Sequence, residues 1–140
     1  MNITELLTDL ASATNAIIRS IASRFNLTAS QAFLLLAIPF NGIPMSGLAH
    51  RLGLDNSTLT RNIQKLEKLG LVGRSADNYD KRVQLVSLTN KGTLLLESFE
   101  SYMEKHNVDI LELIDMDTHV NLLTVLEKLS WALGCMRQKI

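Results

Sequence analysis

The chain lacks the features that several common classes of protein need. Its single cysteine, Cys135, excludes an internal disulfide and a four-cysteine zinc site. No apolar run reaches the roughly 18 residues that a membrane-spanning helix requires. The opening residues MNITE lack the basic start of a signal peptide. We therefore expect a cytoplasmic protein that does not associate with membranes.

Chemical motifs are also scarce. No histidine accompanies Ser57 or Thr60, and the chain has neither a glycine-rich phosphate loop nor a metal-binding motif. The three histidines pair at most loosely with acidic residues at helical spacing, as His119 does with Asp115, and such a pair is not a zinc site. The sequence therefore predicts neither an enzyme nor a cofactor. The composition, 46% hydrophobic and 20% charged, is that of a chain with a folded core.

Charge is balanced overall but distributed unevenly. Residues 42–92 contain eight Lys and Arg against four Asp and Glu, a net charge of +4. The rest of the chain carries six against ten, a net charge of −4. A basic centre in an acidic frame directs an anionic partner to one region. Chance clustering of solvated charges is the alternative explanation.

Apolar spacing predicts a mainly α-helical protein with one small β-hairpin. Helices are expected over residues 3–24, 28–38, 45–52 and 55–69, with strands over 71–75 and 82–88 joined by a turn-rich segment. Thr28 with Gln31 forms a capping box, Asp55 or Asn56 caps the fourth helix, and Gly70 closes it. Thr89 is expected to cap a fifth helix ending near residue 106 or 113, and Asp117 to cap a last helix.

The fourth helix has two distinct faces. Leu59, Ile63 and Leu66 lie on one face at steps of four and three residues. Hydroxyl, amide and cationic side chains occupy the opposite face, namely Ser57, Arg61, Gln64, Lys65 and Lys68. Such a polar face suits the major groove of DNA. The hairpin that follows ends in Asp80-Lys81-Arg82, whose basic tip would reach a second groove.

An ordered set of short motifs runs through this region. The motifs are LTxxQ at 27–31, LAxxLGLD at 48–55, STLTRxIxxLExxGLVxR at 57–74, DxR at 80–82 and LTxxG at 88–92. With these spacings the chain resembles the MarR transcriptional regulators over essentially its whole length. The resemblance implies a dimeric winged helix-turn-helix protein that binds palindromic double-stranded DNA. Such proteins usually repress transcription, and many release DNA when a small molecule or an oxidant binds.

The resemblance also implies a set of DNA-binding residues, which simple chemistry supports. Near the start of the fourth helix, Ser57, Thr58 and Thr60 are predicted to contact phosphates. Arg61, Gln64 and Lys65 are predicted to meet base edges. Arg82 would enter a minor groove, and Asp80 would orient it or its hairpin. Arg74 is predicted to contact a phosphate, with a merely solvated side chain as an equal alternative.

We expect three regions along the chain. Residues 1–27 would form an N-terminal dimerisation helix, 28–92 the winged helix-turn-helix domain, and 93–140 the C-terminal dimerisation helices. The apolar stripes of the end helices, including Val120 to Met136, predict a homodimer because a small winged domain cannot cover them. Two alternatives stay open, a redox-sensing regulator acting through Cys135 and a helical dimeric interaction protein without DNA binding. Phe33, Phe40 and Trp131 either line an effector cavity or belong to the core.

Overall fold

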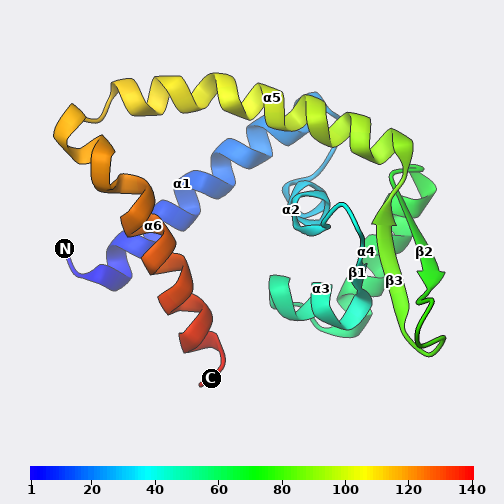
Figure 1. Ribbon diagram of the computed structural model, residues 1–140. Coiled ribbons are helices and arrows are strands. Elements are labelled where there is room, and N and C mark those ends of the chain that lie inside the picture. Colours follow the sequence, from blue (N-terminus) through cyan, green and yellow to red (C-terminus); the bar gives the residue numbers. More distant parts are fainter. The chain divides into compact units, whose positions relative to one another are not determined.

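The computed structural model describes the backbone of residues 1–140 and every side chain except those of Met116 and Val120. Val120, which the sequence assigns to the apolar stripe of the last helix, is therefore outside the described side chains. The chain divides into two compact units, an N-terminal unit over Met1–Tyr102 and a C-terminal unit over Met103–Ile140. Figure 1 labels the elements in chain order.

The N-terminal unit begins with three helices whose ends follow local rules. They are α1 (Ile3–Arg24), α2 (Ala29–Ala37) and α3 (Met45–Leu52). Thr28 and Gln31 form the predicted capping box at the start of α2, with reciprocal hydrogen bonds of 2.9 and 3.1 Å. Gly53 ends α3 in the left-handed conformation, with a φ of 65°. All three predicted helices are confirmed.

The next helix and a hairpin complete a winged helix-turn-helix. Helix α4 (Asn56–Lys68) is followed by strands β2 (Val72–Ala76) and β3 (Gln84–Leu88), which pair antiparallel. A strand of only two residues, β1 (Ile43–Pro44), pairs with β3 on its other edge, giving the order β1-β3-β2. The sequence analysis did not predict β1. The predicted fold class, mainly α with a small hairpin wing, is confirmed (Figure 1).

The core of the N-terminal unit is built from the apolar faces of these elements. Its largest fully buried side chains are Leu34, Leu35, Leu48, Leu59, Ile63, Leu66, Leu71, Val86 and Phe99. Phe99 comes from the first half of α5 (Asn90–Glu112), and its ring lies 5.6 Å from that of Phe25. Residues from α4, β3 and α5 therefore share one core, which fixes the helix-turn-helix and wing against the start of α5.

The C-terminal unit contains the end of α5 and helix α6 (Met116–Arg137). Asp115 caps α6 by accepting a hydrogen bond of 3.0 Å from the backbone N–H of Thr118. The prediction that Asp117 caps this helix is therefore wrong. The helix begins earlier, and Asp117 lies in its first turn, where a carboxylate still faces the positive end of the helix dipole. None of the described helices is both long and apolar enough to cross a bilayer.

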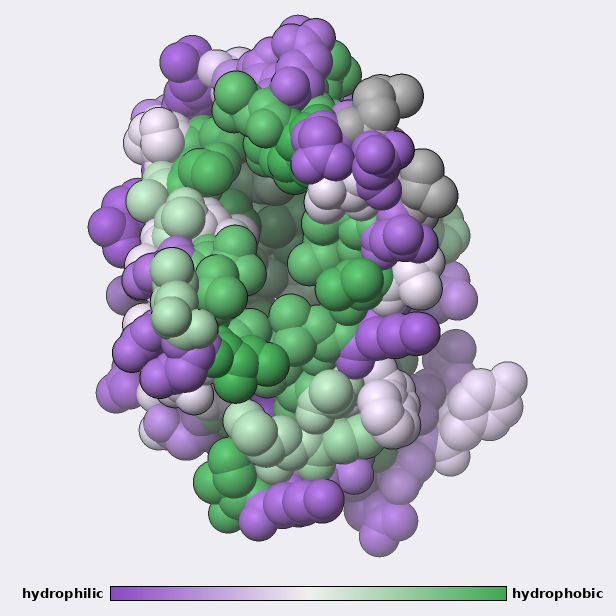
Figure 2. Space-filling view, turned by 90° about the vertical axis from the view of Figure 1, so that its left-hand side faces the viewer, coloured by the Kyte–Doolittle hydropathy of each residue, from purple (hydrophilic) through white to green (hydrophobic). Residues whose placement is uncertain are grey.

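Each terminal helix exposes apolar side chains within its own unit, and Figure 2 shows apolar side chains at the molecular surface. In the N-terminal unit, α1 exposes Ile3, Leu6, Leu10 and Ile17. In the C-terminal unit, α6 exposes Leu123, Leu126, Trp131 and Met136. The single chain thus leaves these helices incompletely covered.

Candidate nucleic-acid interface

Helix α4 starts at a tightly bonded cap. The carboxylate of Asp55 accepts hydrogen bonds from the backbone N–H of Thr58 at 2.7 Å, from Ser57 Oγ at 2.7 Å and from Thr58 Oγ1 at 2.8 Å. These bonds, the backbone one first, lower the pKa of Asp55 from 3.8 to about 2. Each hydroxyl has one proton to donate, so in this state Ser57 and Thr58 donate to the cap.

The outward face of α4 is cationic and polar, as the sequence predicts. Leu59, Ile63 and Leu66 have no exposed surface and hold the helix on the core. Arg61, Gln64, Lys65 and Lys68 are exposed on the other side. Arg61 Nη2 lies 3.4 Å from Thr58 Oγ1, a long contact that leaves its guanidinium available for other acceptors. Thr60 donates back to the carbonyl of Asn56 at 2.8 Å.

The tip of the wing is ordered by one carboxylate. Asp80 accepts hydrogen bonds of 3.1 Å from the backbone N–H, Nε and Nη2 of Arg82. The Arg82 guanidinium lowers the pKa of Asp80, and the carboxylate raises the pKa of Arg82 in return. Arg82 nevertheless remains 92% exposed. The expected contact between the two side chains is therefore present, and it presents a fixed, accessible cation. Tyr79, also at this tip, is 98% exposed and was not singled out from the sequence.

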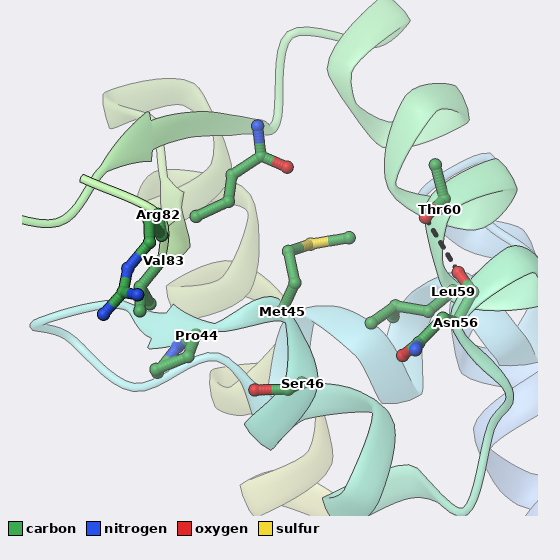
Figure 3. A pocket seen from close by; sticks show the side chains of 9 residues that line it. Pro44, Met45, Ser46, Asn56, Leu59, Thr60, Arg82 and Val83 are labelled. Atoms are coloured by element: carbon green, nitrogen blue, oxygen red, sulfur yellow. Dashed lines mark hydrogen bonds between the residues drawn. The ribbon is translucent and has the colours of Figure 1, made fainter. Parts of the chain in front are cut away.

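A groove of about 340 Å³ separates the start of α4 from the wing. It is lined by Pro44, Met45, Ser46, Asn56, Leu59, Thr60, Arg82, Val83 and Gln84. In Figure 3 the residues of α3 lie at its centre, with Arg82 on one side and Thr60 on the other. Two predicted site residues that are 22 positions apart in the sequence thus border one concave surface.

Arg74 differs from the other predicted site residues. Its guanidinium is paired with the carboxylate of Glu67, and the side chains are only 23% and 32% exposed respectively. Lys91, another cation of the basic centre, donates from Nζ to the carbonyl oxygen of Leu69 at 2.8 Å. Both cations are therefore engaged within the protein. The sequence pattern of α4 gives no sign of this pairing with a residue of β2.

The remaining candidates are distributed over both units. Phe33 borders a second cavity, of about 330 Å³, between α2, α3 and α4, while Phe40 and Trp131 are exposed rather than part of the core. Cys135 is a half-buried free thiol. Among the side chains that the structure describes, no three His, Cys, Asp or Glu residues lie close enough together to hold a metal ion.

Comparison with known families matches the region that contains this groove. Residues 39–83 match the model of the MarR family. This segment is a MarR-family domain. The match covers β1, α3, α4, β2 and the wing tip, so the MarR-family domain holds all nine residues that the sequence predicts to bind DNA.

Solved structures extend the likeness of fold beyond the MarR-family domain. A mutant MarR from E. coli complexed with operator DNA has a TM-score of 0.75 at 24% identity, over 91% of this chain and 92% of that one. The S. aureus MepR–DNA complex has a TM-score of 0.75 at 19% identity, over 94% and 98%. The transcriptional regulator SlyA has a TM-score of 0.81 at 20% identity, over 99% and 98%. At these identities the likeness shows a shared fold, and it confirms the winged-helix architecture.

Proposed function

We propose that this protein is a sequence-specific, double-stranded DNA-binding transcriptional regulator that represses its targets. The observation that carries the proposal is the groove between α4 and the wing, bordered by Thr60 and the exposed, oriented guanidinium of Arg82. The cationic face of α4 lies beside it. The MarR-family match and the DNA complexes of MarR and MepR support the same function. A regulator of this kind would act in the cytoplasm.

In this proposal α4 is the recognition helix and enters a major groove. Arg61, Gln64 and Lys65 read base edges, since guanidinium and ammonium groups suit guanine and an amide suits adenine. Ser57, Thr58 and Thr60 contact phosphates near the start of the helix. Ser57 and Thr58 must turn their hydroxyl protons from Asp55 to do so, whereas their backbone amides need no such change.

Arg82, which lies at the tip of the wing, enters the adjacent minor groove of the DNA. A narrow, A·T-rich minor groove has an enhanced negative potential that attracts such a cation. Asp80 holds the guanidinium by two hydrogen bonds and the backbone N–H of Arg82 by a third, which reduces the entropy that Arg82 would lose on binding.

The test is affinity for duplexes selected by the wild-type protein from a random pool, then varied at inner and flanking positions. Arg61→Ala should cost about 1–3 kcal/mol per lost contact and relax preference at one symmetric pair of positions. Arg82→Ala should weaken binding mainly where the flanks are A·T-rich. Lys105→Ala, an exposed cation outside this surface, is the control. Wild-type affinity for every duplex after either Arg substitution would refute the assignment of that residue, and absent duplex binding would favour a helical interaction protein.

We further propose that the protein is a homodimer. Residues 28–92 would form the DNA-binding domain, and residues 1–27 with 93–140 the dimerisation region. The exposed apolar side chains of α1 and α6 support this, because burying them against a second copy removes apolar surface from water. Two copies related by a twofold axis would bind a palindromic site. Sedimentation should give a dimer at micromolar concentration, and a monomer that persists at that concentration would refute the proposal.

Relief of repression by a small molecule is the last part of the proposal. The 330 Å³ cavity, lined by Ser30, Phe33, Leu34, Arg51, Leu52, Leu54 and Asn62, has the size of a small-molecule site. Phe33 and the leucines suit an apolar body. Arg51, whose Nη1 donates to the carbonyl of Ala37 at 3.1 Å, would exchange a present partner for an anionic group of the ligand. Because Asn62 belongs to α4, an occupant would touch the recognition helix. In a screen of small organic acids, ligands that raise the melting temperature should lose that effect with Phe33→Ala. A Phe33→Ala variant that responds like wild type would refute this site.

A further inference from the structure

We propose that Arg74 and Lys91 are positioning residues that hold the last turn of the recognition helix and do not contact DNA. The inference rests on the proposed DNA binding. Of the eight cations in residues 42–92, these two would then stabilise the position of α4 and would not bind phosphate. The surface that meets phosphate is then narrower than the charge distribution indicates.

The first support is the pair between β2 and α4. Arg74 Nε donates to Glu67 Oε1, joining the middle of β2 to the last turn of α4. Both side chains are at least two-thirds covered by protein. A partly buried pair is screened less than a surface pair, and either partner would be left with an uncompensated charge if the other turned to solvent. Arg74 therefore has a strong competing partner for any phosphate.

The second support is a clasp between the end of α4 and the start of α5. Gly70, with a φ of 74°, ends the helix, and Leu71 N–H returns to the carbonyl of Leu66 at 3.0 Å. Two further carbonyls accept hydrogen bonds from residues around the start of α5. Thr89 Oγ1 donates to Gly70 O at 2.6 Å, and Lys91 Nζ donates to Leu69 O at 2.8 Å. A cation at this end of a helix is also favoured by the helix dipole.

The two contacts together explain how a helix with a cationic outer face keeps a defined orientation. Leu59, Ile63 and Leu66 seat α4 on the core, but its last turn ends at the surface, where Lys68 and Leu69 are exposed. Glu67 fixes that turn to the sheet, and Lys91 fixes it to α5. Side chains that read bases need supports that hold them to within about 0.5 Å. Lys65 and Lys68 extend from the turn that is held in this way.

Glu67→Ala distinguishes a phosphate-contacting Arg74 from a positioning Arg74, because it removes a negative charge close to the proposed DNA surface. If Arg74 contacts a phosphate, the variant frees a guanidinium and should bind duplex as tightly as wild type or more tightly. If Arg74 positions α4, the variant should bind roughly tenfold more weakly, by analogy with a lost charge-assisted hydrogen bond. Arg74→Ala and the double variant should then match Glu67→Ala, since all three lose the same pair. Glu67→Gln, which keeps an acceptor, should recover part of the affinity.

Salt dependence gives a second, independent readout. Each phosphate contact contributes about 0.9 to the slope of log affinity against log salt. Arg74→Ala and Lys91→Met should lower affinity while leaving this slope at the wild-type value. Lys68→Met, which removes an exposed cation from the polar face of the same turn, is the matched control and should reduce the slope. A reduced slope for Arg74→Ala or Lys91→Met overturns the positioning role of that residue, as does unchanged affinity.

Hydrogen exchange tests the clasp without DNA. The backbone amides of residues 66–71 should exchange faster in Glu67→Ala, Arg74→Ala and Lys91→Met than in wild type or Lys68→Met. If exchange accelerates but wild type binds no duplex, the proposed function fails and the mechanical role stands. If exchange is unchanged while wild type binds DNA, the inference fails and the proposed function stands.

Discussion

Gly92 lies where the start of α5 crosses the chain that leaves helix α4. A Cβ built on Gly92 would lie 1.9 Å from the carbonyl oxygen of Leu71 and 2.9 Å from its carbonyl carbon. An ordinary carbon–oxygen contact is about 3.3 Å, so Gly92→Ala forces a separation of roughly 1.4 Å. The atoms that must yield are backbone. Leu71 and Val72 are buried, at 2% and 3% exposure, and have little room to move.

The magnitude follows from three opposing effects. Overpacking a tight site costs about 1–3 kcal/mol. Moving Leu71 also disturbs its 3.0 Å hydrogen bond from Thr89 N–H, which is worth about 0.5–1.5 kcal/mol. Against these, replacing a helical glycine by alanine gains up to about 1 kcal/mol. The net expectation is a destabilisation of about 1–3 kcal/mol.

Gly134→Ala in α6 supplies the matched control, because a Cβ added there would meet no atom within 4 Å outside its immediate helix surroundings. It should gain up to about 1 kcal/mol. The free energy of unfolding would be measured in denaturant at equal protein concentration, since dimerisation would make stability depend on concentration. A Gly92→Ala variant as stable as wild type would show that the backbone of Leu71 can move aside. The short distance between Gly92 and the Leu71 carbonyl would then not restrict residue 92 to glycine.

Two further predictions concern titration and oxidation. Because the folded pKa of Asp55 is about 2, against 3.8 for an ordinary carboxyl, its cap stabilises above pH 3.8 and is lost as pH falls toward 2. Wild type should therefore lose more stability between pH 4 and pH 2 than Asp55→Asn, which keeps a capping acceptor, and equal losses would contradict this. Hydrogen peroxide should change duplex affinity equally in wild type and Cys135→Ser, whereas a response confined to wild type would support the redox alternative.

The features predictable from sequence are those set by neighbours in the chain. Thr28 and Gln31 form a capping box because each lies three residues from the other's backbone N–H, whatever the rest of the fold does. Asp55 marks the start of α4 and Gly70 marks its end for equally local reasons. The buried and exposed faces of α4 follow from a period of 3.6 residues, so the polar surface can be assigned from the sequence alone.

The features that the sequence analysis missed depend on distant partners or on competing local ones. Strand β1 has two residues, Ile43 and Pro44, and exists because β3 offers an edge opposite them. No periodicity can arise from two residues. The start of α6 had two suitable caps, Asp115 and Asp117. Thr118, three residues after Asp115, donates both its N–H and its hydroxyl to that carboxylate, and this pairing decides between them.

Distant partners also decide the roles of the cations in residues 42–92, so the net charge of this region alone does not identify which of them bind DNA. Arg61 and Arg74 contribute equally to the net charge of +4, yet Arg74 is paired with a half-buried carboxylate while Arg61 makes only a long contact to a hydroxyl. A cation can attract DNA from a distance whether or not it is paired, but a cation that is mostly covered by protein reaches a phosphate only by leaving its present acceptor. Exposure and existing partners, rather than charge alone, therefore separate the proposed contacts from the proposed supports. By this criterion Arg82 belongs with the contacts, because its bonds to Asp80 leave 92% of the side chain exposed to a groove of DNA.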